Sequence, residues 1–234
     1  PRRLSSYALG SDAPIVLFDP RLAAVPAWAE RPIFFDIETT GLSGGAGTIA
    51  FLAGCGWFEE GGFRVRQFLL TGPAGESDLL DALGEVFDEA SLLVTYNGRT
   101  FDVPTMETRW AFHRRPSPVG DLPHFDMLPA ARRLWARRQP RPDVAMPRVG
   151  AFAIPPAGAD PAGSCSLTAL ERSVLGFHRT DDVPGFEIPG RYFQFLRSGD
   201  AAPVRGVIEH NQFDLVSLAA VMTHALDLVA TGPD

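Results

Sequence analysis

Two acidic side chains interrupt an apolar stretch near the start of the chain. Asp36 and Glu38 lie within residues 33–42, where β-branched and aromatic residues predict a short buried strand that enters a Thr/Gly turn. Because side chains alternate along a strand, both carboxylates project from the same face of the sheet. In apolar surroundings two neighbouring carboxylates repel each other and lose hydration, which a fold tolerates when a cation binds them. The pair therefore predicts a divalent metal site, with a solvent-facing strand end as the simpler alternative.

Acidic residues recur at two later points of the chain. Asp102 follows residues 97–101, which join a predicted strand to a helix, and ligands bind at this end of parallel strands in α/β sheets. His210 and Asp214 are four residues apart in a predicted helix, a spacing that places both on one face. Simpler interpretations are a first-turn acid favoured by the helix dipole for Asp102, and a surface ion pair for His210 with Asp214. Taken together with the first pair, four acids and a base favour a metal site.

Residue types and periodicity predict the elements that position these side chains. Predicted strands cover residues 33–38, 48–57, 63–70, 92–96 and 124–128, and predicted helices cover 76–90, 100–115, 129–138, 166–176, 189–198 and 203–230. A short turn at 59–62 makes the second and third strands a hairpin, whereas a helix before the fourth strand requires a crossover and a parallel pairing with the first. Thr100 is expected to cap the second helix. This order predicts an α/β fold with a mixed five-stranded sheet, three antiparallel strands followed by parallel strands, flanked by helices.

Length and composition favour one elaborated domain. With 234 residues, 45% of them hydrophobic, we expect a domain at 31–230, an N-terminal arm at 1–30 and a Pro-rich loop insertion at 139–165. The absence of long heptads, of a signal peptide and of an apolar run of membrane-spanning length predicts a soluble monomer, or a modest assembly as the alternative, that does not bind membranes. Cys55 and Cys165 belong to no CxxC pair, which argues against zinc and a disulfide framework and favours a reducing, cytoplasmic location.

The formal net charge of −7 bears on the expected partners. A general nucleic-acid coat protein is usually basic, so this charge argues against that class. It does not exclude a nuclease, because metal-binding carboxylates contribute to the count and their ions neutralise them.

Three motifs occur in the order found in a known superfamily. Asp36-Ile-Glu38, Asn97-x-x-x-Phe101-Asp102 and His210-x-x-x-Asp214 resemble the DEDD superfamily of 3′–5′ exonucleases. More closely, over roughly residues 31–228, the chain is similar to the bacterial YprB-like group of ribonuclease H-like proteins. This likeness extends through Tyr96-Asn97-Gly98, His124-Phe-Asp126, Ser166-Leu-x-x-Leu-Glu171, Asp181-Asp182-Val-Pro184-Gly185 and His210-Asn211. One departure is that DEDD enzymes with a histidine usually place it five residues before the last Asp, whereas here the spacing is four, as in those with a tyrosine.

The resemblance implies a ribonuclease H-like fold and two-metal phosphodiester hydrolysis. Two Mg²⁺ or Mn²⁺ ions would be held by Asp36, Glu38, Asp102 and Asp214. His210 would take the proton from the attacking water. The terminal nucleotide would be bound by Thr39, Gly41 and Leu42. The path of the nucleic-acid strand would be lined by Asn97, Arg99 and Phe101. An ordinary core position is the alternative for Phe101. Phosphate contacts or a solvated helix face would account for the arginines, namely Arg99, Arg109, Arg114, Arg115, Arg132, Arg133, Arg137, Arg138 and Arg141.

The expected function is a metal-dependent 3′–5′ exonuclease in DNA repair. DNA is the expected substrate, as a single strand or at a 3′ end, with RNA as the alternative and a repair helicase as a partner. Two other functions stay open: a ribonuclease or structure-specific endonuclease on the same fold, and a non-catalytic module that binds nucleic acid. Asp181, Asp182 and Glu187 form a further acidic group, for which the sequence indicates no role beyond capping or loop structure.

Overall fold

The computed structural model describes residues 13–25, 28–41, 47–136 and 164–231. Leu42, most of the predicted Pro-rich insertion and the first part of the predicted arm lie outside these ranges, so the predictions for them are not addressed below.

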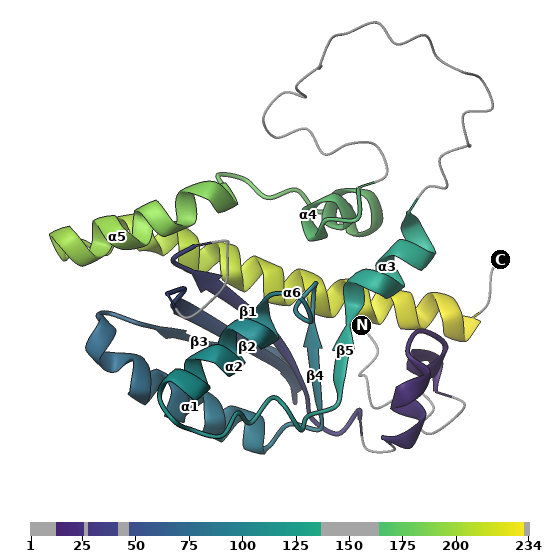
Figure 1. Cartoon of the computed structure of the whole chain (residues 1–234). Coiled ribbons are helices and arrows are strands. Elements are labelled where there is room, and N and C mark those ends of the chain that lie inside the picture. The colour runs from purple at the N-terminus through teal and green to yellow at the C-terminus, as the bar shows by residue number, and fades with distance from the viewer. Residues whose placement is uncertain (1–12, 26–27, 42–46, 137–163, 232–234) are drawn as a thin grey trace, which may run out of the picture.

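A mixed five-stranded sheet with the order β3-β2-β1-β4-β5 forms the centre of the molecule (Figure 1). Its strands are β1 (Pro32–Thr39), β2 (Ala50–Glu59), β3 (Gly62–Leu69), β4 (Leu92–Thr95) and β5 (His124–Asp126). The first three form an antiparallel meander, β4 pairs with β1 in parallel, and β5 pairs with β4 in parallel. The predicted sheet is therefore confirmed. Strand β5 is shorter than predicted, because the side chain of Asp126 accepts the backbone N–H of Leu128 and starts a helix there.

Helices cover both faces of the sheet (Figure 1). Their bounds are α1 (Glu76–Asp88), α2 (Asp102–Phe112), α3 (Met127–Trp135), α4 (Leu167–Leu170), α5 (Ile188–Ser198) and α6 (Ala202–Thr231). Along β1, Ile33 and Phe35 pack with apolar residues of α1 and α2, whereas Phe34 packs with the C-terminal half of α6. Because Asp36 and Glu38 follow Phe34 at two-residue steps, they project on the α6 side.

Helix α6 crosses β1, β2 and β3 and is the longest element in the described chain (Figure 1). Its buried face includes Val207, Leu215, Leu218 and Met222, which pack on the sheet and its neighbouring helices. By length and a mean hydropathy of 1.6 this helix alone among the described ones could cross a membrane. Half of its most apolar window is buried inside the molecule, however, so its apolar side chains are accounted for by the core.

The described part of the N-terminal segment packs into the same core. Two 3₁₀ turns, Pro14–Leu17 and Pro20–Ala24, precede β1. Ile15 and Trp28 are fully buried and belong to the cluster that contains Phe34. This segment therefore covers part of the sheet on the α6 side.

Arg109 joins α2 to α1 through a buried ion pair with Glu76. The phosphate interpretation and the solvated-face interpretation are therefore both wrong for this residue. The residue is 2% exposed, and its guanidinium donates to both carboxylate oxygens of Glu76, with an Nη2–Oε2 distance of 2.6 Å. His113 Nε2 lies 2.8 Å from the same carboxylate. Nearer the surface, Arg115 also pairs with Asp81 on α1. These contacts dock the helix that carries Asp102.

We predict that Glu76→Gln destabilises the protein by about 3–5 kcal/mol, because Arg109 would stay buried without its carboxylate. Urea unfolding followed by circular dichroism measures this change. The exposed Glu85 on the same helix provides the matched control Glu85→Gln, which should change the free energy of unfolding by less than about 0.5 kcal/mol. Equal stabilities for the two variants would contradict the assignment.

Candidate active site

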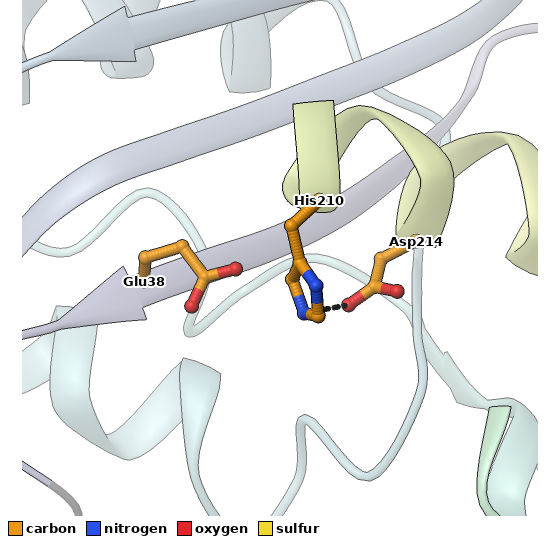
Figure 2. A group of neighbouring side chains, drawn as sticks. All are labelled: Glu38, His210 and Asp214. Carbon is orange, nitrogen blue, oxygen red and sulfur yellow. Dashed lines mark ion pairs between the residues drawn. The ribbon is translucent and has the colours of Figure 1, made fainter. Parts of the chain in front are cut away.

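Strand β1 and helix α6 bring one acid of the strand together with an acid and a histidine of the helix (Figure 2). Glu38, His210 and Asp214 each offer one ligand atom, and these atoms lie within 4.8 Å of one another. Nε2 of His210 is 3.6 Å from Oδ2 of Asp214, as the four-residue spacing on one helix face predicts. The structure therefore places residues that are more than 170 positions apart in sequence around one point.

Asp36 lies in the same region, deeper beneath α6. Burial raises the pKa of this carboxyl well above its ordinary value, and the negative charges of Asp214, Glu38 and Asp102 raise the pKa further. Asn211, which is fully buried, donates from Nδ2 to Oδ2 of Asp36 at 2.8 Å. This amide fixes the orientation of the carboxylate without supplying a positive charge.

Asp102 is the first residue of α2 and is tied directly to β1. Its Oδ1 accepts the backbone N–H of Ile37 at 3.2 Å, between the two acids of the strand. Burial raises the pKa of this carboxyl to about 7, against the opposing effect of the Ile37 hydrogen bond. Asp102 is also an acid in the first turn of a helix, where the helix dipole favours negative charge. It therefore fits the interpretation as a first-turn acid and also lies near Asp36.

The loop between β4 and α2 is held in place by Asp126. Its carboxylate accepts the backbone N–H of Asn97 at 2.8 Å and that of Arg99 at 3.1 Å. Asn97 has a φ of 65°, in the left-handed region. A Cβ on Gly98 would come within 2.5 Å of Thr95, so the turn requires glycine there. The loop thus delivers Asp102 to the end of β1.

Three predictions about this loop have different outcomes. Thr100 does not cap α2, because its hydroxyl donates to the carbonyl and side-chain oxygens of Asn97, one turn before the helix begins. The Arg99 guanidinium bonds to Asp19 at 2.9 Å and to the carbonyl of His124. This engagement with the arm leaves the predicted phosphate contact of Arg99 without support. Phe101 is half-buried and packs against the core, in agreement with the ordinary alternative for that residue.

The turn after β1 is described as far as residue 41. The hydroxyl of Thr39, which is buried, donates to the carbonyl of Gly41 at 2.8 Å. Among the described residues, none has an atom within 4 Å of a Cβ placed on Gly41. The contact of Thr39 and Gly41 with a terminal nucleotide stays a prediction.

A buried arginine in this cluster was not found from the sequence. Arg179, in the loop before α5, has a side chain that is 4% exposed and donates to Glu171 with an Nε–Oε2 distance of 2.8 Å. It also pairs with Asp214, and with Asp182 at 3.2 Å. Nothing in the residue's own neighbourhood signals this role. Its partners Glu171 and Asp182 lie in motifs that resemble the YprB-like group. The resemblance therefore pointed to this segment but did not predict the contacts of Arg179.

The cluster carries more negative charge than its arginine can neutralise. Among the residues that the structure describes, no arginine forms an ion pair with Asp36, Glu38 or Asp102. Burial is the first cause that raises the pKa of Glu38 as well, and the charge of Asp214 adds to it. Grouped carboxylate oxygens are the ligands that Mg²⁺ and Mn²⁺ prefer. The donor set therefore fits hard divalent cations.

Comparison with known proteins gives the family of this chain. A family model described as the RNase H superfamily matches residues 33–226. The chain belongs to the RNase H superfamily. A relative, the uncharacterized protein YprB of Bacillus subtilis (strain 168), is 36% identical over 192 residues. The match covers 82% of this chain and 41% of YprB, so the chain spans about two fifths of that relative's length.

A solved structure shares the RNase H superfamily fold of this chain. The family B DNA polymerase from the hyperthermophilic archaeon Pyrobaculum calidifontis matches with a TM-score of 0.52 at 15% identity, over 87% of this chain and 27% of the polymerase chain. The predicted resemblance to YprB-like, ribonuclease H-like proteins and the predicted fold are thus confirmed. Membership of the RNase H superfamily supports a nuclease-type function.

The contact between Asn211 and Asp36 depends on a glycine in β2. Gly54 pairs with Asp36 across the sheet, and a Cβ on it would lie 2.2 Å from Oδ1 of Asn211 and 2.7 Å from Leu215. Helix α6 can therefore approach the sheet this closely only if residue 54 has no side chain.

We predict that Gly54→Ala destabilises the protein by about 1–3 kcal/mol, because the methyl group forces Asn211 or α6 to move. Thermal unfolding checks the effect. Gly62→Ala in β3 is the matched control, since a Cβ there meets no atom within 4 Å. If Gly54→Ala unfolds like the control, the close approach of α6 is not required.

Proposed function

We propose that this member of the RNase H superfamily is a metal-dependent 3′–5′ exonuclease that acts on DNA. One observation supports the proposal above all: Glu38 of β1 and Asp214 of α6 lie in one partly buried group with His210. Asp36 and Asp102 are close enough for their charges to interact with this group. The exonuclease polarity, the DNA substrate and a role in repair with a helicase rest on the resemblance to DEDD exonucleases and YprB-like proteins.

In this proposal the four acidic residues hold two divalent cations, and other groups of the chain orient them. The ligands would be Asp36, Glu38, Asp102 and Asp214. When bound, the cations would supply a water that is acidic at neutral pH and would offset charge on the phosphate. Asn211 keeps Asp36 directed at the cluster, and the N–H of Ile37 does the same for Asp102. Nε2 of His210 faces the group and can accept a proton from the attacking water.

We expect the purified protein to shorten 5′-labelled DNA stepwise from the 3′ end in Mg²⁺ or Mn²⁺. Asp36→Asn, Asp102→Asn and Asp214→Asn should each lower the rate at least about a hundredfold, because even residues that only support metal ligands are worth 10–100-fold. Asp88→Asn, at an exposed position on α1, is the matched control and should keep wild-type activity. Denaturing gel electrophoresis resolves the product ladder.

The same assay separates the alternatives. Cleavage of circular DNA would indicate an endonuclease, and degradation of labelled RNA in preference to DNA would indicate a ribonuclease. A protein that binds DNA but leaves every substrate intact would be a binding module. Wild-type rates in all three Asp→Asn variants would contradict the site assignment itself.

Metal binding should also stabilise the fold. At a concentration of about 100 times Kd, a cation that binds only the folded protein contributes about 2.7 kcal/mol, so Mn²⁺ should raise Tm by several degrees. Asp36→Asn should reduce this shift, whereas NaCl at matched ionic strength should not produce it. A Tm that Mn²⁺ leaves unchanged in the wild type would argue against a preformed metal site.

A further inference from the structure

His210 is held by a carboxylate outside the four predicted metal ligands. Its Nδ1 lies 2.7 Å from Oδ1 of Asp182, while its Nε2 lies 3.6 Å from Asp214, beyond hydrogen-bond distance. An ionised carboxylate only accepts hydrogen bonds, so the proton of a neutral imidazole belongs on Nδ1. Nε2 then carries the lone pair, on an imidazole that lies between Glu38 and Asp214 (Figure 2).

Asp182 is itself held by two donors. Its Oδ1 also accepts the backbone N–H of Val183 at 2.9 Å, and its Oδ2 accepts from Arg179 at 3.2 Å. Arg179 is in turn held by Glu171, in the π-helical turn Glu171–Leu175 that follows α4. The carboxylate that faces His210 is therefore fixed in place from a part of the chain that contributes no predicted metal ligand.

We propose that Asp182 is the positioning residue of His210, and that it holds the imidazole in the tautomer with hydrogen on Nδ1. This inference rests on the proposed function, because the tautomer matters only if Nε2 serves as a base. When water gives a proton to Nε2, the O–H bond breaks, an N–H bond forms and the ring becomes an imidazolium. Asp182 faces the charge that develops and stabilises it, as buried carboxylates do for catalytic histidines in other enzymes.

The alternative is that Asp182 only anchors its loop. In that case its loss would loosen the loop without changing where the proton of His210 lies. Asp182→Asn distinguishes the two roles, because the amide keeps the shape of the side chain but has only one oxygen. The charged donor Arg179 holds that oxygen on the side where Oδ2 lies, so the NH₂ group faces Nδ1 and donates to it. A reversed tautomer has hydrogen on Nε2 and cannot accept a proton there.

The first measurement is the histidine ¹⁵N–¹H correlation spectrum of the full chain at pH 8, where an ordinary imidazole is neutral. His210 is one of five histidines and is assigned from the signal that His210→Gln removes. We expect hydrogen on Nδ1 in the wild type and a loss of that tautomer in Asp182→Asn. Asp181→Asn is the matched control, since its side chain is exposed and asparagine tolerates the left-handed backbone found there (φ 59°).

The second measurement is steady-state nuclease kinetics with the same three proteins. We expect Asp182→Asn to lower kcat about a hundredfold or more, with little change in KM and with the Mn²⁺-induced Tm shift intact. Asp181→Asn should match the wild type in all three quantities.

Several outcomes would overturn the inference. Hydrogen on Nε2 in the wild type would do so without any variant, and so would an unchanged tautomer in folded Asp182→Asn. A kcat that falls only together with the Tm shift would assign Asp182 a structural role. If the wild type cleaves nothing, the proposed function fails, whereas the spectrum still decides whether Asp182 sets the tautomer.

Discussion

The close approach of α6 to the sheet is the constraint on which the candidate site depends. The glycine at position 54 leaves no side chain between helix and strand, so Asn211 reaches Asp36 and the following turn of the helix presents Asp214 beside Glu38. A wider separation would leave the acids of β1 facing a gap that water fills. Their carboxylates would then titrate normally and would attract a cation only weakly.

This packing concentrates like charge in a partly buried place, which lowers the stability of the fold. The described part of the chain offsets only some of that charge, through Arg179 on Asp214 and the two acids beside it. Residual charge of this kind is typical of functional sites, where a fold tolerates local repulsion for the sake of a ligand. Arg179 also fixes the orientation of Asp214, because one guanidinium holds this carboxylate together with those of Asp182 and Glu171.

Local periodicity was sufficient to predict the order of strands and helices and the faces on which the acids lie. Asp36 and Glu38 follow from the two-residue repeat of a strand, and His210 with Asp214 from the four-residue spacing of a helix. Local periodicity does not predict which side chains meet when they are far apart in sequence. Arg99 and Arg109 were considered for phosphates, but each pairs with an acid at least 33 positions away, and Arg179 and Asp214 are 35 positions apart. Thr100 failed as a cap because its hydroxyl is used in the turn that begins at Asn97, and sequence propensity does not reveal such competition.

The link between Arg99 and Asp19 gives the N-terminal segment a part in the geometry of the site. Asp19 lies in the segment that buries Ile15 and Trp28, and Arg99 belongs to the loop that delivers Asp102. A shorter protein that begins at β1 would expose the apolar surface around Phe34 and release one end of this tether. The segment therefore braces the loop between β4 and α2 from behind, and the geometry at the start of α2 depends on residues that precede the first strand.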